Sequence, residues 1–240
     1  MRENPIGVFD SGVGGLLVLN KLAAAMPSER FIYLADRAHM PYGGKSEIDI
    51  RRAACSCSDA LFAMNCKAIV IACNTATTVA VRDIRKLYPN RIVVGLEPAV
   101  RPCLKELGRR GYAVALVTPA TAGSEKLKRL LSGADGKVII SPQPRLAELV
   151  ENNIQDLSAL NPFVEEILAP YKDAEAVILG CSHYSAIAPI ITAFYGGNIK
   201  IYDGADGAVA RLKQCLALAD LCAPQGERGD IRFYGTEKGS

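Results

Sequence analysis

Short apolar runs alternate with longer amphipathic stretches along the first hundred residues of the chain. The apolar runs at residues 6–9, 31–34, 68–72 and 92–96 are typical of buried strands. Between them, residues 15–25, 46–65 and 77–87 space their apolar side chains for one face of a helix. This alternation predicts an α/β fold with a mainly parallel sheet.

The same series begins again after residue 97, with strands predicted at 113–117, 137–140, 176–179 and 199–202. One constant offset of 108 places 6–10 on 114–118, 31–32 on 139–140, 68–75 on 176–183 and 90–94 on 198–202. A constant offset indicates a duplication, so we expect two similar, pseudo-symmetric lobes with the active site between them.

We expect the first lobe to span residues 1–97 and the second 98–207. The rest of the chain predicts a helix to about residue 221 and a strand at 231–234. Since chain termini often lie close together, we expect residues 208–240 to return to the first lobe.

Composition narrows the class of protein. Half of the 240 residues are apolar and 22% are charged, which suits a globular chain and excludes a disordered or coiled-coil one. A net charge of +3 without a basic block gives no reason to expect nucleic acid or a membrane surface as partner. The chain shows neither a membrane-spanning apolar stretch nor a signal peptide, so we expect a cytoplasmic protein.

The eight cysteines suggest reduced thiols rather than a disulfide framework, because the chain is long enough to have its own core. They also lack the spacing of a metal site: there is no C-x-x-C pair, and only His39 and His183 could assist. We therefore predict no metal.

Polar residues follow several of the predicted strands, where parallel sheets bind ligands. These residues are Asp10-Ser11-Gly12, Cys73-Asn74-Thr75 and Cys181-Ser182-His183. The offset makes Cys73 and Cys181 equivalent positions, each at a strand end and near a helix N-terminus, where the pKa of a thiol is often lowered. His183, close to one thiol, is a candidate base. The other cysteines are interpreted as small core residues.

Two glycine-rich loops add backbone amides. The loop at residues 10–15 lacks the Gly-Lys-Ser/Thr of a P-loop and has Leu17 where a dinucleotide loop has its third glycine, so it is weak evidence for a nucleotide. We interpret it as a tight turn that brings amides and the Ser11 hydroxyl toward a small anion. The loop at residues 41–45 adds amides and the Tyr42 phenol.

Two matched thiols suit the inversion of a Cα centre. One base removes the proton from one face of the carbon while an acid delivers a proton to the other, and the roles exchange in the reverse direction. The twin lobes thus predict a two-base proton transfer.

At these residues the chain resembles the glutamate racemases of the aspartate/glutamate racemase superfamily. The matching stretches are residues 9–16 (FDSGVGGL), 41–46 (PYGGKS), 72–76 (ACNTA), 149–151 (LVE) and 179–184 (LGCSHY). The resemblance implies cofactor-independent interconversion of L- and D-glutamate for peptidoglycan, usually by a homodimer.

The resemblance also implies roles for single residues. Cys73 would act on the D enantiomer with Asp10, and Cys181 on the L enantiomer with His183 and Glu151. The residues implied to hold the substrate are Asp10, Ser11, Tyr42, Gly43, Asn74, Thr75, Thr121, Ser182 and His183.

The sequence departs from the family at a few positions, among them Ser182 and Thr77, where the family usually has Thr and Ser, and residues 37–40 (RAHM). Two alternatives therefore stay open. One is a racemase of the same superfamily that acts on aspartate or another amino acid. The other is a catalytically silent protein that binds an amino acid.

Overall fold

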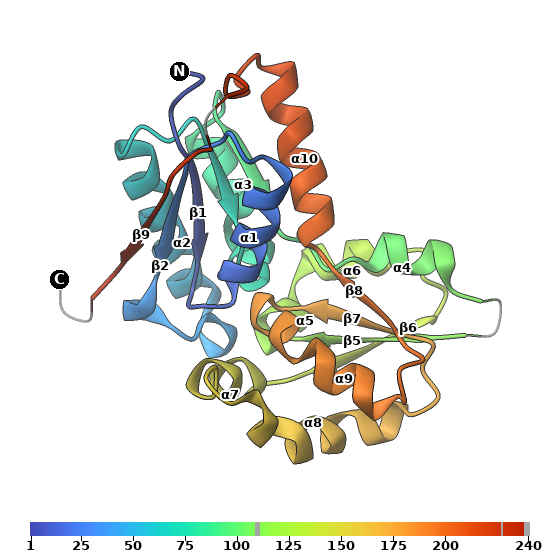
Figure 1. The fold of residues 1–240 in the computed structure, drawn as a ribbon. Helices are drawn as coiled ribbons and strands as arrows, with labels where there is room; N and C mark the ends of the chain where they lie inside the picture. The colour runs from blue at the N-terminus through green and yellow to red at the C-terminus, as the bar shows by residue number, and fades with distance from the viewer. Residues whose placement is uncertain (109–110, 227, 238–240) are drawn as a thin grey trace.

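The computed structural model describes residues 1–108, 111–226 and 228–237 and contains two parallel sheets (Figure 1). The first sheet has the order β4-β3-β1-β2-β9, and its strands are β1 (Ile6–Asp10), β2 (Phe31–Ala35), β3 (Ala68–Ile71), β4 (Ile92–Gly95) and β9 (Ile231–Gly235). The second has the order β6-β5-β7-β8, with β5 (Ala113–Val117), β6 (Val138–Pro142), β7 (Ala176–Gly180) and β8 (Lys200–Asp203). The predicted α/β fold of two similar lobes is confirmed.

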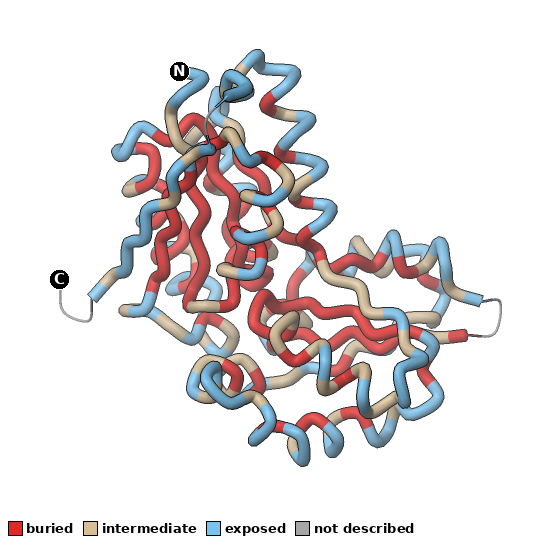
Figure 2. Tube along the Cα trace, in the orientation of Figure 1, coloured by how far each residue is buried: buried red, intermediate tan, exposed pale blue. Residues whose placement is uncertain are grey.

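Helices cover both faces of each sheet, and β1, β2, β3, β5 and β7 are buried along their whole length, whereas the edge strand β9 is mostly exposed (Figure 2). On the first sheet, α1 (Gly15–Ala25) and α10 (Ala205–Leu218) pack on one face, and α2 (Glu47–Ala63) and α3 (Asn74–Leu87) on the other. On the second, α4 (Val100–Glu106), α5 (Pro119–Gly123) and α6 (Glu125–Leu131) lie on one side, and α7 (Leu146–Asn152), α8 (Asn161–Leu168) and α9 (Ala188–Phe194) on the other. Short 3₁₀ turns complete the fold: η1 (Arg37–His39), η2 (Tyr42–Gly44), η3 (Leu157–Leu160), η4 (Ala169–Tyr171) and η5 (Ser182–Ile187).

The strand orders β4-β3-β1-β2 and β8-β7-β5-β6 are the same arrangement built twice. Strand pairing sets Ile6 opposite Ala68 in one sheet and Ala113 opposite Ala176 in the other. Ile6 therefore corresponds to Ala113, an offset of 107, whereas β3 and β4 keep the predicted 108. The expectation of a single gapless offset is wrong by one residue, and Ser11 rather than Asp10 is the counterpart of Thr118.

The chain crosses between the sheets twice, from β4 to α4 and from β8 to α10. The two crossings touch: a Cβ added at Gly204 would lie 2.1 Å from the carbonyl oxygen of Glu97, so no larger residue fits there. Two ion pairs flank them, Lys126 with Glu97 at 2.6 Å and Lys21 with Asp203 at 3.2 Å. The crossings thus form a close-packed junction between the lobes.

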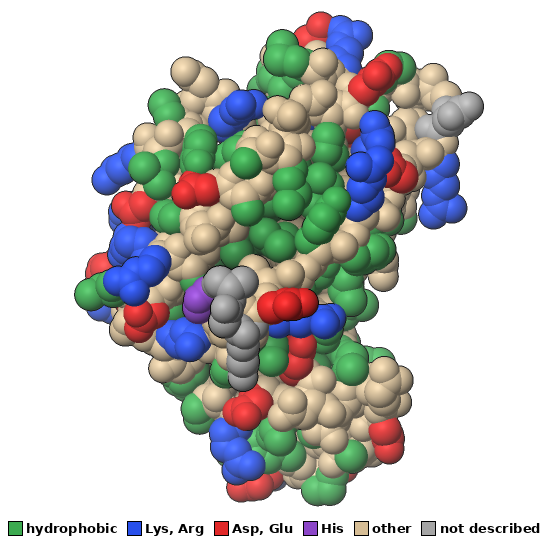
Figure 3. All heavy atoms as spheres, turned by 90° about the vertical axis from the view of Figure 1, so that its left-hand side faces the viewer, with side chains coloured by type: hydrophobic (Ala, Val, Ile, Leu, Met, Phe, Trp, Pro, Cys, Tyr) green, Lys and Arg blue, Asp and Glu red, His purple; other side chains and the backbone are tan. Residues whose placement is uncertain are grey.

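Strand β9 is the edge of the first sheet and pairs in parallel with β2. Its Phe233 and Tyr234 side chains are 64% and 43% exposed. Hydrophobic and charged side chains are mixed on this side of the molecule (Figure 3). Among the described residues, no helix has both the length and the apolar character needed to cross a membrane.

Candidate active site

The two equivalent cysteines lie just beyond the carboxyl ends of equivalent strands. Cys73 follows β3 and caps α3, its sulfur accepting a hydrogen bond from the Ala76 amide at 3.5 Å. Capping explains why α3 begins at Asn74, three residues earlier than predicted. Cys181 directly follows β7 and precedes η5. Both cysteines line one small cavity between the lobes, with a volume of about 10 Å³.

Two side chains are linked in series to Cys181, the imidazole of His183 and the carboxylate of Glu151, and we call this arrangement the relay. His183 places Nδ1 3.9 Å from the Cys181 sulfur and Nε2 2.6 Å from a Glu151 oxygen. Burial alone would lower the pKa of His183, but hydrogen bonds to Cys181 and Glu151 outweigh it and raise that pKa well above its usual value. Burial would likewise raise the pKa of Glu151, but the hydrogen bonds from His183 and from the Val13 amide hold it below its usual range. Glu151 is therefore a carboxylate that orients a cationic His183.

Asp10 and Ser11 lie on the side of Cys73. The Ser11 hydroxyl is 3.7 Å from the Cys73 sulfur. Asp10 is completely buried and accepts hydrogen bonds from the Gly12 amide at 3.0 Å and the Ser182 hydroxyl at 2.9 Å. Burial nevertheless raises the pKa of Asp10.

The sequence suggested a lowered pKa for Cys73, and the structure corrects this. Burial, followed by the nearby Asp10, raises the pKa of Cys73 to about 12, although the Ala76 amide favours the thiolate. One hydrogen bond from a helix N-terminus does not offset the removal of the sulfur from water. Cys73 is thus a protonated thiol, a potential proton donor.

Backbone amides of the glycine-rich loop at residues 10–15 donate hydrogen bonds to carboxylates of the protein itself. The Val13 amide donates to Glu151 at 2.9 Å, and the Gly12 amide donates to Asp10. A Cβ at Gly14 would lie 2.6 Å from the backbone nitrogen of His183, so this glycine allows the second lobe to approach. The interpretation of these amides as a site for a small external anion was therefore wrong for Gly12 and Val13.

A chain of hydroxyls crosses the lobe interface. Thr118 donates to Thr121 at 3.0 Å, so Thr75 is the donor in its 2.9 Å hydrogen bond to Thr118. Thr118 lines the cavity, but the sequence prediction did not include it. Had the offset of 107 been recognised, it would have paired Thr118 with Ser11 and so found this residue.

The remaining expected residues divide into those that face the cavity and those that support them. Ser11, Tyr42, Gly43, Thr75 and His183 line the cavity. Those outside its lining are Asp10, Asn74, Thr121, Glu151 and Ser182. Tyr42 brings no free phenol, because its hydroxyl donates to Asp36 at 2.5 Å. Glu148, Met40 and Ala147 also line the cavity and were not predicted.

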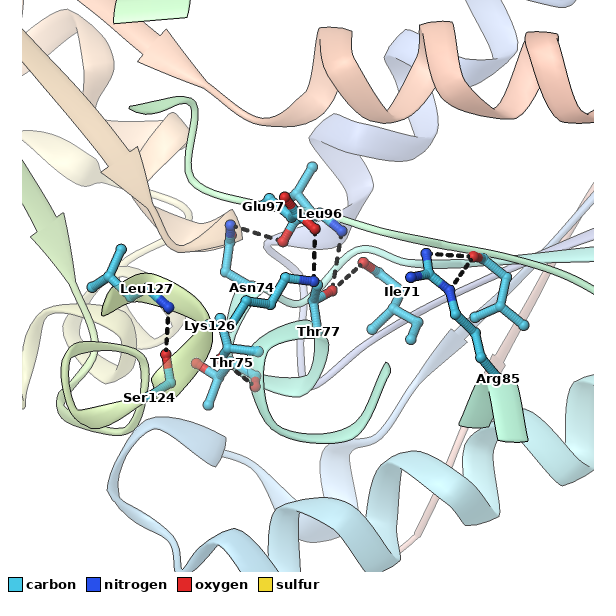
Figure 4. A network of polar contacts seen from close by, with 12 residues as sticks. Ile71, Asn74, Thr75, Thr77, Arg85, Leu96, Glu97, Ser124, Lys126 and Leu127 are labelled. Carbon is cyan, nitrogen blue, oxygen red and sulfur yellow. Dashed lines mark hydrogen bonds and ion pairs between the residues drawn. The ribbon is translucent and has the colours of Figure 1, made fainter. Parts of the chain in front are cut away.

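Asn74 points toward the junction of the lobes, where its amide nitrogen donates to the Leu96 carbonyl at 3.2 Å (Figure 4). Nearby, Thr77 bonds the Ile71 carbonyl and the Leu96 amide, which fixes the start of α3 against β4. The Oδ1 atom of Asn74 is buried and has no hydrogen-bond partner within the described part of the chain. A buried, unpaired acceptor is costly, so Asn74 is ready to receive a donor.

Across the described ranges, no cluster of three or more His, Cys, Asp or Glu side chains is arranged to hold a metal ion. The chemical groups gathered at the cavity are two thiols, an imidazole and several hydroxyls. Such groups can move protons.

Comparison with known proteins assigns this duplicated α/β fold to an isomerase class, the amino-acid racemases. The chain belongs to the Asp/Glu/Hydantoin racemase family, which matches residues 10–212. A glutamate racemase of Clostridium perfringens is 37% identical over 240 residues, covering 98% of this chain and 92% of the relative. One of Pseudomonas putida is 38% identical, covering 97% and 89%.

Solved structures agree with this assignment. The glutamate racemase of Bacillus anthracis superposes with a TM-score of 0.87 at 28% identity, covering 99% of this chain and 90% of that one. The glutamate racemase of Francisella tularensis in complex with D-glutamate gives 0.82 at 28% identity, covering 99% and 89%.

Proposed function

We propose that this racemase interconverts L- and D-glutamate by a cofactor-independent transfer of protons between two cysteines. The observation that carries the proposal is that Cys73 and Cys181, equivalent residues of the two lobes, line one cavity. The relatives named glutamate racemase, and the homologue solved with D-glutamate, favour glutamate as the substrate.

In the L-to-D direction, the Cys181 thiolate takes the proton from Cα and becomes a thiol. The Cys73 thiol gives its proton to the opposite face of the planar carbanion and becomes a thiolate. No atom is gained or lost, and the reverse reaction exchanges the two roles. The protonated state of Cys73 and the cationic His183 beside Cys181 support this starting arrangement.

The developing negative charge must be met by hydrogen bonds, because charge in a buried site is costly unless donors are in place. We assign this task to the Ser11 hydroxyl, to the Gly43 amide and to the Thr75 hydroxyl, whose proton becomes available when its hydrogen bond to Thr118 breaks. The unpaired Oδ1 of Asn74 is the acceptor that we assign to the substrate ammonium group. Asp10, Thr121 and Ser182 support these groups from behind.

A cavity of about 10 Å³ has room for roughly one water molecule. An amino acid can therefore enter only when the lobes separate. Separation breaks the Asp10–Ser182, Val13–Glu151 and Thr75–Thr118 hydrogen bonds and leaves the crossings at residues 97 and 204 as the hinge.

The experiment is incubation of the purified protein with each glutamate enantiomer in D₂O, followed by chiral and mass analysis. Product should carry deuterium at Cα from the first turnover, while unreacted substrate stays largely protiated at early times. Cys73→Ala and Cys181→Ala should each abolish racemisation in both directions, whereas Cys215→Ala, a half-buried cysteine on α10, should not. Racemisation by either single active-site variant near the wild-type rate contradicts the mechanism.

Aspartate assayed in parallel decides the substrate. If the protein converts aspartate in preference to glutamate, the proposed substrate is wrong but the proposed mechanism stands. If it binds glutamate without exchange of the Cα hydrogen, it is a catalytically silent binding protein.

We extend the proposal to the supply of D-glutamate for peptidoglycan by a cytoplasmic homodimer. Complementation of a bacterium that requires external D-glutamate tests the first part. Sedimentation at several protein concentrations tests the dimer, and a single monomeric species at all concentrations argues against it.

A further inference from the structure

The loop at residues 36–45, here called the substrate loop, carries Tyr42 and Gly43 to the cavity. It is held by one buried carboxylate. Asp36, only 1% exposed, accepts hydrogen bonds from the Tyr42 hydroxyl at 2.5 Å and from His39 at 3.0 Å. The third partner of Asp36 comes from a distant part of the chain.

That partner is Thr236, 200 residues away in the sequence, immediately after β9. Its hydroxyl donates to Asp36 at 2.6 Å and accepts a hydrogen bond from the Ala38 amide at 3.0 Å. Its own amide donates to the Ala35 carbonyl at 3.0 Å. All three contacts of Thr236 go to residues at the base of the substrate loop.

Strand β9 makes a second contact near the site through Phe233, whose ring centroid lies 6.2 Å from that of Tyr33. Both Phe233 and Tyr234 remain partly exposed, and the strand is held to β2 by the parallel ladder. The Thr236 hydroxyl is a point at which the segment that follows this edge strand contacts the substrate loop directly.

We propose that Thr236, acting through Asp36, is a positioning residue that fixes the substrate loop so that Tyr42 and Gly43 face the two thiols. The expected effect on KM rests on the proposed function, whereas the expected effect on the order of the loop does not. A preorganised loop loses less conformational entropy when substrate binds, so Thr236 stabilises the substrate complex. It makes no contact with the reacting atoms, so the chemical step does not depend on it directly.

Thr236→Val removes both hydroxyl hydrogen bonds while keeping the shape of the side chain. Losing a hydrogen bond to a buried carboxylate corresponds to roughly tenfold in an equilibrium constant, so KM for glutamate should rise by about that factor. The value of kcat should change by less than about twofold, because the substrate complex and the transition state lose the same stabilisation. Thr236→Ser keeps the hydroxyl and should restore most of the wild-type KM.

Amide hydrogen exchange, measured without substrate, tests the structural part independently of catalysis. Exchange in residues 36–45 should accelerate in Thr236→Val and stay close to wild type in Thr236→Ser. The matched control is Thr192→Val on α9, whose half-buried hydroxyl bonds the Ala188 carbonyl away from the cavity. This control should change neither loop exchange nor KM.

A double variant checks the route through Tyr42. Tyr42→Phe removes the hydrogen bond from the loop to Asp36, so Thr236→Val should raise KM less in that background than in the wild type.

Unchanged loop exchange in Thr236→Val overturns the proposal, and so does a Ser variant that behaves like Val. A fall in kcat alone, or an equal loss of protection throughout the chain, assigns Thr236 a merely structural role and also overturns it. If the wild type does not racemise glutamate but loop exchange responds as expected, the proposed function fails and the role of Thr236 in ordering the loop stands.

Discussion

Replacement of Glu151 by glutamine tests the relay behind Cys181. Glu151 is only 12% exposed in its side chain, and one of its oxygens accepts both from His183 at 2.6 Å and from the Val13 amide at 2.9 Å. Glutamine has the same shape and keeps an acceptor for both donors. Glu151→Gln thus removes the negative charge and little else.

The size of the effect follows from the two kinds of hydrogen bond. A bond to a charged group contributes about 1.5–3 kcal/mol and a neutral one about 0.5–1.5 kcal/mol, so the change costs about 1–2 kcal/mol. That range corresponds to a fall of roughly 5- to 30-fold in kcat/KM. Because the two enantiomers have equal free energies, kcat/KM must fall by the same factor in both directions, which provides an internal check on the assay.

The pH profile gives a second readout. The Glu151 carboxylate helps to raise the pKa of His183, so its removal lowers that pKa. The cationic imidazole is then lost at lower pH, and the alkaline limb of the kcat/KM profile should move to lower pH. Glu166→Gln, an exposed change on α8 in the same lobe, is the matched control and should leave the profile unchanged.

The folding stability should also depend on pH through the Glu151 carboxylate. The pKa of Glu151 is lowered in the folded state, so its contribution is present above about pH 4.3 and disappears as pH falls through the folded-state value. Chemical unfolding of the Gln variant should lack this acid-dependent loss. If kcat/KM and the alkaline limb both match wild type, Glu151 does not act on His183 and the relay is wrong.

Three further changes test the site from other directions. Asp10→Asn should lower kcat but leave Tm at neutral pH unchanged or higher. Burial raises the pKa of Asp10, so the wild-type protein loses stability as pH rises through that pKa, and the uncharged Asn does not. A lower Tm of the variant at neutral pH would contradict this reasoning. Gly14→Ala should abolish most activity, because the new Cβ would overlap the His183 backbone; near wild-type turnover shows that the lobes need not approach so closely. Glu148→Gln should lower KM for the anionic substrate about two- to fivefold at low ionic strength and not at high salt, because this exposed carboxylate borders the cavity; an effect independent of salt excludes charge as the cause.

The sequence by itself determined the strands, most helices and the positions of the two thiols. Every predicted strand exists, with bounds that differ by at most two residues. Apolar runs of four or five residues and their spacing are local properties, and they follow from burial on both faces of a parallel sheet. The match between Cys73 and Cys181 also needed no structure, because both follow strands whose offset is unchanged.

The register between the strands and the hydrogen-bond partners of the side chains were decided only by the tertiary structure. The one-residue change of offset between β1 and β3 is set by strand pairing across the sheet, and it hid Thr118 from the sequence comparison. Nothing near Tyr42 in sequence indicates that Asp36 takes its hydroxyl, nor that Thr236 joins them.

The protonation of Cys73 shows the same division. A local pattern indicates a helix N-terminus, which favours a thiolate, but only the packed lobes enclose the sulfur and place Asp10 beside it. The free energy of removing a charge from water depends on all surrounding atoms, most of them distant in sequence. For this reason the sequence could identify the reacting groups, whereas only the fold fixed their charges and their neighbours.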